Sequence, residues 1–238
     1  MLIALALLAC TGGDAQDSVA DTTPTEITWP SSNRVLVYQG HGGVSGDSVG
    51  NGGWNQVVEE LNAAGFEAET RSSMSDASAY RAVFFISPGQ QEDVILGENT
   101  VASIQAGLEA GTRMIVLAGE DNCDSRAIST LLSDLGAPMS LTGESSSVPV
   151  LAQAQPGNQL AKGIEEGVLL SNPCTIDKGD ADAELSVDRD LVAVSWRPGW
   201  GGDVVLVGDH RFADDTGRWK NRDNLRFVLN LAEVDPEY

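Results

Sequence analysis

Seven side chains that could bind a ligand or transfer protons stand directly after stretches that are predicted to be buried strands. They are His41, Gln90, Glu120, Asp121, Asn122, Asp209 and His210. Open α/β sheets bind ligands beyond the carboxyl ends of their strands, so these residues form the predicted ligand-binding site. The catalytic candidates among them are Glu120, Asp121, Asp209 and His210, because carboxylates and imidazole can move protons or hold a metal that activates water.

Two functions from different classes remain open for this edge of the sheet. One is a non-catalytic module that binds a protein partner or a small molecule. The other is a metal-assisted hydrolase that uses the acids and the histidines. No compact ligand motif of the form H-E-x-x-H occurs, and the sequence predicts neither a resident metal nor a cofactor. Polar residues also collect at strand ends simply to satisfy loop backbones, which favours the binding module.

The first cysteine closes an unbroken apolar run, residues 1–9. Such a run is too short to span a bilayer, which takes about 20 helical residues, but it suits the apolar region of a signal peptide. Leu7-Leu8-Ala9-Cys10 resembles a lipobox, where signal peptidase II cuts before a cysteine that carries diacylglycerol, although Leu8 is bulkier than usual. The sequence therefore predicts a lipoprotein that is held by membrane lipid through Cys10 in the bacterial cell envelope, at the outer membrane or the periplasmic face.

The other two cysteines are Cys123 and Cys174. Two thiols in an oxidising compartment most often pair, so a disulfide between them is expected. Residues 10–32 are rich in Thr, Asp, Ser, Gly and Pro, a composition typical of a flexible linker. Residues 33–238 then remain for a single folded domain.

The chain carries a net charge of −21, from 35 acidic and 14 basic residues. Such a field repels phosphate, so nucleic acid is not an expected partner. An apolar fraction of 42% is ordinary for a folded domain. The acidic run from Asp177 to Glu184 has the oxygen ligands that calcium prefers, but it lacks EF-hand spacing, and a solvated turn is the preferred interpretation.

Hydrophobic periodicity predicts the elements that would position these residues. Helices are expected at 54–64, 98–110, 125–135 and 223–232, and glycines follow the first three. Apolar runs predict strands at 34–38, 66–70, 82–87, 114–118, 168–170, 191–195 and 204–207. The alternation predicts an α/β fold with a mostly parallel sheet and helices on both faces. In the C-terminal half, a hairpin of 191–195 with 204–207 predicts an antiparallel β extension.

Four segments together resemble the class I glutamine amidotransferase-like superfamily, in particular its non-enzymatic members in bacterial surface proteins and GIFT-type domains. They are Gly111-Thr-Arg-Met-Ile-Val-Leu-Ala-Gly-Glu120, Leu160-Ala-Lys-Gly-Ile164, Gly201-Gly-Asp-Val-Val-Leu-Val-Gly-Asp209 and Asp223-Asn-Leu-Arg-Phe-Val-Leu-Asn230. The resemblance implies a flavodoxin-like sheet over residues 34–233.

The resemblance also implies where a nucleophile would stand. Catalytic members carry a cysteine in a Gly-x-Cys-x-Gly turn between a strand and a helix. The matching turn here is Gly119-Glu-Asp-Asn-Cys123, with an acid at the nucleophile position and the cysteine displaced along the chain. A nearby acid raises the pKa of a thiol rather than lowering it. The domain is therefore predicted to lack amidotransferase activity.

Overall fold

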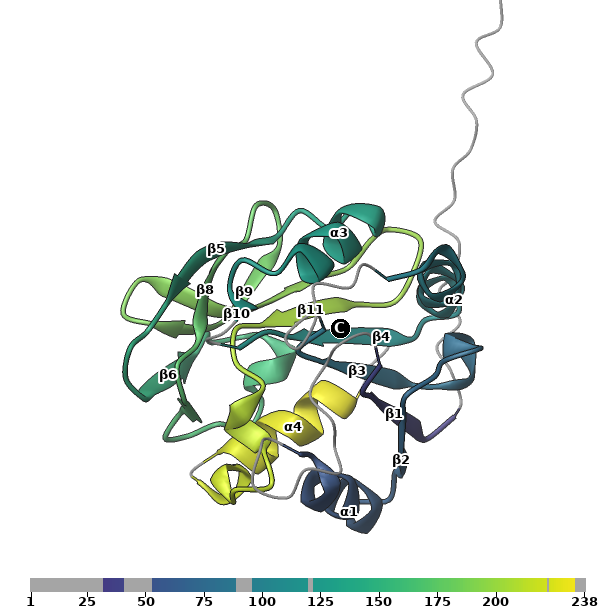
Figure 1. Ribbon diagram of the computed structural model, residues 1–238. Helices are drawn as coiled ribbons and strands as arrows, with labels where there is room; N and C mark the ends of the chain where they lie inside the picture. Colours follow the sequence, from purple (N-terminus) through teal and green to yellow (C-terminus); the bar gives the residue numbers. More distant parts are fainter. Residues whose placement is uncertain (1–31, 41–52, 89–95, 120–121, 222, 234–238) are drawn as a thin grey trace, which may run out of the picture.

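The computed structural model describes residues 32–40, 53–88, 96–119, 122–221 and 223–233. One half of its 11-stranded sheet is parallel, with the strand order β2-β1-β3-β4-β11. The bounds are β1 Arg34–Tyr38, β2 Glu67–Arg71, β3 Ala82–Ile86, β4 Arg113–Leu117 and β11 Val204–Val207. Figure 1 shows these strands side by side in the middle of the molecule.

The other half of the sheet is antiparallel, and it continues from β11 through β10, β9, β6 and β7. The bounds are β5 Ser140–Ser145, β6 Val150–Ala154, β7 Val168–Leu170, β8 Cys174–Asp177, β9 Asp182–Val187 and β10 Asp190–Trp196. Strands β5 and β8 pair with each other beside β10. The expected hairpin is confirmed, with Ala193 opposite Val207. The sheet differs from the expected mostly parallel one, because its antiparallel part is as extensive as its parallel part.

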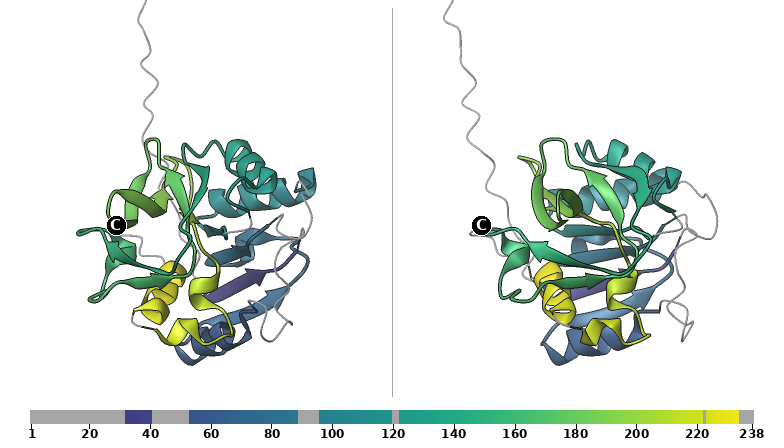
Figure 2. Two further views of the ribbon diagram at one scale, coloured as in Figure 1. Left: turned by 60° about the vertical axis from the view of Figure 1, so that its left-hand side comes forward. Right: turned by 90° about the vertical axis from the view of Figure 1, so that its left-hand side faces the viewer.

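The four α-helices cover both faces of the parallel strands. They are α1 Asn55–Ala63, α2 Glu98–Glu109, α3 Arg126–Asp134 and α4 Asn224–Ala232. Helices α1 and α4 pack on one face, and α2 and α3 pack on the other (Figures 1 and 2). Short 3-10 helices lie at Ala77–Ala79, Gln159–Ala161, Arg211–Ala213 and Arg218–Lys220. No helix in the described part of the chain is both long and apolar enough to cross a membrane.

The parallel strands read as continuous apolar runs because both of their faces are buried. In β1, Val35 and Val37 face the core beneath α1 and α4, whereas Leu36 and Tyr38 face the core beneath α2 and α3. The helices end where glycines in the left-handed region follow them, at Gly65, Gly111 and Gly136 with φ of 98°, 88° and 70°. This packing brings the ends of β3, β4 and β11 together at the carboxyl edge.

Candidate functional site

His210 lies at the carboxyl edge of the sheet, three residues after β11, and its side chain is only 2% exposed. Its Nδ1 is 3.1 Å from the carbonyl oxygen of Ala118, just past β4. Because a carbonyl can only accept, this contact places a hydrogen on Nδ1 and leaves Nε2 as the basic nitrogen of the neutral ring. The indole Nε1 of Trp54 donates to the His210 carbonyl at 3.1 Å, which fixes the backbone of the same residue.

Gly119 is required by the close approach of this imidazole. A Cβ atom built at Gly119 would stand 2.5 Å from Nδ1 of His210. Any side chain there would displace the ring from its bond to Ala118. The glycine that begins the predicted nucleophile turn is therefore explained by packing against the histidine.

Asp209 is 1% exposed, and backbone N–H groups approach both of its carboxylate oxygens. Ser171 N donates to Oδ2 at 2.5 Å, and Arg211 N donates to Oδ1 at 2.8 Å. Burial raises the pKa of Asp209 to about 6, although these two bonds and the charges of Arg218 and Arg211 oppose the rise. The carboxyl group thus ties the start of the β7–β8 connection to the end of β11.

Asn122 is the third predicted residue that lies at this edge, and it is 3% exposed. Its Oδ1 accepts from Gly119 N at 2.7 Å, and its Nδ2 donates to the Pro88 carbonyl at 3.4 Å. These contacts close the turn after β4 and join it to the end of β3. Four other predicted residues, His41, Gln90, Glu120 and Asp121, lie outside the described residues.

The predicted pairing of Cys123 with Cys174 is confirmed. The two sulfurs are bonded, and the Cα atoms are 5.3 Å apart, within the range of ordinary disulfides. Cys174 N also donates to the Gly208 carbonyl at 2.8 Å. The disulfide therefore joins the turn after β4 to β8, immediately beside the end of β11.

Ser87 is a carboxyl-edge residue that the sequence analysis missed. It follows β3, is fully buried, and adopts a left-handed φ of 46°, which is uncommon for a residue other than glycine. Its Oγ has no hydrogen-bond partner within the described ranges, and it lies 3.6 Å from a Cβ built at Gly119. The only hint in the sequence is that this serine stands directly before Pro88-Gly89. The left-handed backbone angle itself cannot be recognised from residue types.

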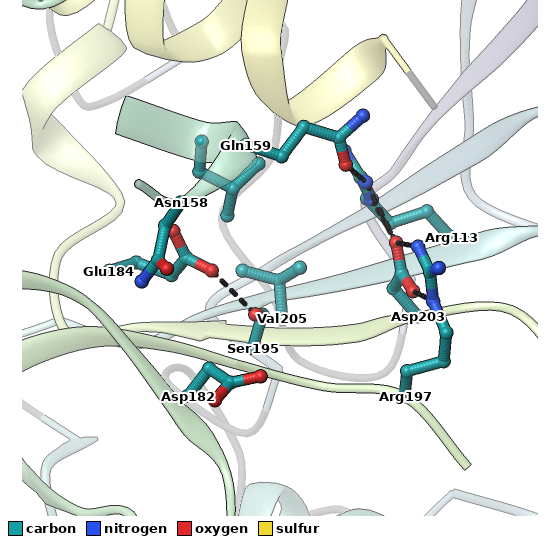
Figure 3. A pocket seen from close by; sticks show the side chains of 10 residues that line it. Arg113, Asn158, Gln159, Asp182, Glu184, Ser195, Arg197, Asp203 and Val205 are labelled. Carbon is teal, nitrogen blue, oxygen red and sulfur yellow. Dashed lines mark hydrogen bonds and ion pairs between the residues drawn. The ribbon is translucent and has the colours of Figure 1, made fainter. Parts of the chain in front are cut away.

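A pocket of about 250 Å³ opens at the opposite, amino edge of β4 and β11 (Figure 3). One wall is a buried cluster of charges, in which Nε and Nη2 of Arg113 lie 3.0 and 2.7 Å from Asp203 Oδ2. Arg197 Nε donates to Asp203 Oδ1 at 2.6 Å. Burial acts to raise the pKa of Asp203, but the two guanidinium groups outweigh it and hold that pKa below its usual value.

Glu184 forms another part of the pocket wall, and it corrects the interpretation of 177–184 as a solvated turn. Glu184 lies in β9 and is 3% exposed. Oε1 accepts from Ser195 Oγ at 2.6 Å, whereas Oε2 is buried and has no hydrogen-bond partner within the described ranges. Burial raises the pKa of Glu184, and the Ser195 bond and Arg113 partly oppose the rise. The sequence does hold one hint of this pocket. Two apolar strands begin beside charged residues of opposite sign, Arg113 and Asp203.

No protein-family model and no curated protein matches the sequence. Solved structures do match, at identities that show similarity of fold alone. The mmIFT52 N-terminal domain aligns with a TM-score of 0.65 and 12% identity, over 84% of this chain and 98% of that one. The cytoplasmic protein STM1381 of Salmonella typhimurium LT2 aligns at 0.62 and 10%, over 84% and 98%. A ThuA-like protein of Bacteroides uniformis aligns at 0.54 and 11%, over 84% and 90%.

Proposed function

We propose that this chain is an exported bacterial lipoprotein, anchored through Cys10, whose amidotransferase-like domain is a non-catalytic binding module. The observation that carries the proposal is the Cys123–Cys174 disulfide. Disulfides persist mainly in oxidising compartments outside the cytosol, in agreement with a lipobox at Leu7-Leu8-Ala9-Cys10. A sulfur in a disulfide is also not a thiolate, so Cys123 cannot attack a carbonyl group.

The parallel strand order supports the family part of the proposal. Along the sheet, β2-β1-β3-β4-β11 corresponds to the order 2-1-3-4-5 of flavodoxin-like folds. The non-catalytic part is supported by the bonds of Asn122, Asp209 and His210, which tie neighbouring loops together through backbone groups. The alternative is a metal-assisted hydrolase, and its candidate residues His41, Glu120 and Asp121 lie outside the described residues. Among the described residues, no group of three or more His, Cys, Asp or Glu side chains could hold a metal.

Anchoring is tested by comparing the wild type with Cys10→Ser after expression in a Gram-negative bacterium. We expect the wild type in the membrane fraction and the variant in the soluble periplasmic fraction, because a serine at this position cannot receive the thioether-linked diacylglycerol of the proposed anchor. Cys10→Ser that stays in the membrane fraction, with the same mass as the wild type, would contradict the lipoprotein proposal.

Catalysis is tested separately with glutamine and with generic ester and amide substrates, each with and without divalent metal ions. We expect no turnover above that of a buffer control. Turnover that disappears in Glu120→Gln or His210→Ala, while Glu59→Gln at an exposed residue of α1 keeps it, would replace the binding module with the hydrolase.

A further inference from the structure

The pocket at the amino edge presents mainly hydrogen-bond acceptors to its interior. Glu184 Oε2 is buried and has no hydrogen-bond partner among the residues that the structure describes, and Figure 3 shows the Glu184 carboxylate on the pocket side of β9, facing Ser195. The Ser195 hydroxyl donates its hydrogen to Glu184 Oε1, which leaves its oxygen only the role of acceptor. Asp182, two residues before Glu184 on the same strand, adds an exposed carboxylate to the lining.

The positive charges of the pocket are already engaged by the protein. Arg113 Nε and Nη2 bond Asp203, and Nη2 also donates to Gln159 Oε1 at 2.7 Å. Arg113 Nη1 lies 2.9 to 3.3 Å from the carbonyls of Asn230, Leu231 and Glu233 at the end of α4. Arg197 meets both oxygens of Asp203. With Arg113 and Arg197 occupied in this way, the pocket is poorly suited to an anionic ligand.

A buried carboxyl oxygen that forms no hydrogen bond destabilises the folded protein, because the oxygen has lost its bonds to water and gained none in return. A donor that enters the pocket would remove this defect, and a positively charged donor would also compensate the charge of Glu184. We propose that this pocket binds the primary ammonium group of a small organic ligand, with Glu184 as its main acceptor and Asp182 and Ser195 beside it. The volume of about 250 Å³ suits a ligand smaller than a typical drug molecule.

The charged neighbours of Glu184 determine how such binding depends on pH. Burial is the largest influence and raises the pKa of Glu184, the Ser195 bond and Arg113 on β4 lower it, and Asp182 on β9 and Asp203 before β11 raise it further; the net shift is upward. An ammonium group favours the ionised carboxylate. The affinity should therefore increase as pH rises through the raised pKa of the Glu184 carboxyl, because the free group loses its proton over that range.

The experiment is isothermal titration calorimetry of the full chain with 2-aminoethanol, and with ethylene glycol as the neutral counterpart in which a hydroxyl replaces the ammonium. We expect saturable binding of 2-aminoethanol with a Kd of about 1 mM or tighter and affinity for ethylene glycol at least about tenfold weaker. Glu184→Gln should weaken 2-aminoethanol binding by about tenfold or more, and Asp182→Asn by a smaller factor. Glu59→Gln, the same change at an exposed residue of α1, should leave it unaltered.

Three results would overturn the inference. Absence of saturation by 2-aminoethanol would show that the buried oxygen of Glu184 serves another purpose. Equal affinity for ethylene glycol would indicate a site for neutral polyols. Tight binding of Ca²⁺ that Glu184→Gln removes would indicate a metal site instead. Urea unfolding of each variant confirms that it is folded, and since no step depends on Cys10, failure here is distinguishable from failure of the lipoprotein proposal.

Discussion

At the scale of single residues, Asp209 shows how the end of β11 uses a carboxyl group for structure. Two backbone N–H groups approach its oxygens, yet burial still raises its pKa to about 6. In the unfolded chain the ordinary value is 3.8. Between these two values the folded protein holds a proton that the unfolded chain has released, so this residue makes the protein less stable as pH rises.

Asp209→Asn therefore changes the pH dependence of stability. We expect the free energy of unfolding of the variant, relative to the wild type, to increase by about 2 kcal/mol between about pH 4 and about pH 7, because Asn carries no titratable proton. Urea unfolding at several pH values measures the difference, with Asp190→Asn, at an exposed residue that begins β10, as the matched control. A difference between variant and wild type that stays constant with pH would contradict the assignment.

Arg113 is the second residue that we expect to contribute strongly to the free energy of unfolding. It is buried, pairs with Asp203, and donates to three carbonyls at the end of α4. Arg113→Met leaves Asp203 with Arg197 alone and the carbonyls without their donor. We expect a loss of about 3–5 kcal/mol in the free energy of unfolding. Arg126→Met, at an exposed residue of α3, is the control, and equal urea midpoints for the two variants would show that the buried pair contributes nothing.

At the scale of elements, the helices were predicted within one residue at each end. Their apolar positions recur with the helical period, and glycines mark where three of them stop. The strands β5, β6, β8 and β9 were not predicted individually. Most residues of β5 are exposed, so its sequence Ser140–Ser145 has no apolar alternation to show that it pairs with β8. Pairing between distant strands, rather than local pattern, holds these elements in place.

The two candidate sites differ in the same way, since one follows from local sequence pattern and the other from long-range strand pairing. Residues at the carboxyl edge were predictable because strand ends can be read from apolar runs. The pocket was not, since Arg113 and Asp203 are far apart in the sequence and meet only because β4 pairs with β11. Glu184 was placed in a solvated turn because acidic neighbours surround it, whereas β9 buries it.

The disulfide is the covalent link between elements, joining the turn after β4 to β8 across 51 residues. Replacing both Cys123 and Cys174 with Ala should lower the free energy of unfolding by about 4 kcal/mol, from the loop entropy that returns to the unfolded chain. Urea unfolding under non-reducing conditions measures this, with Cys10→Ser as a control that removes a cysteine elsewhere. An unchanged midpoint in the double variant would mean that the bond is not formed in the native protein.

At the scale of the whole molecule, the two edges of the sheet differ in character. At the carboxyl edge, the described polar side chains mostly bond to backbone groups and hold loops together. At the amino edge, a pocket contains an acceptor that the protein itself does not satisfy. The net charge of −21 adds a general preference for cations over anions in the surroundings.

The central claim, an exported and lipid-anchored domain with a structural disulfide, can be tested by one measurement. It is the intact mass of the native protein, extracted from bacterial membranes without reductant and treated with a thiol-alkylating reagent. We expect a chain that begins at Cys10, carries the mass of a diacylglycerol-modified cysteine, and takes up no alkylating group. A mass that retains residues 1–9 without lipid, and that gains alkyl groups on Cys123 and Cys174, would contradict both the compartment and the fate of the cysteines.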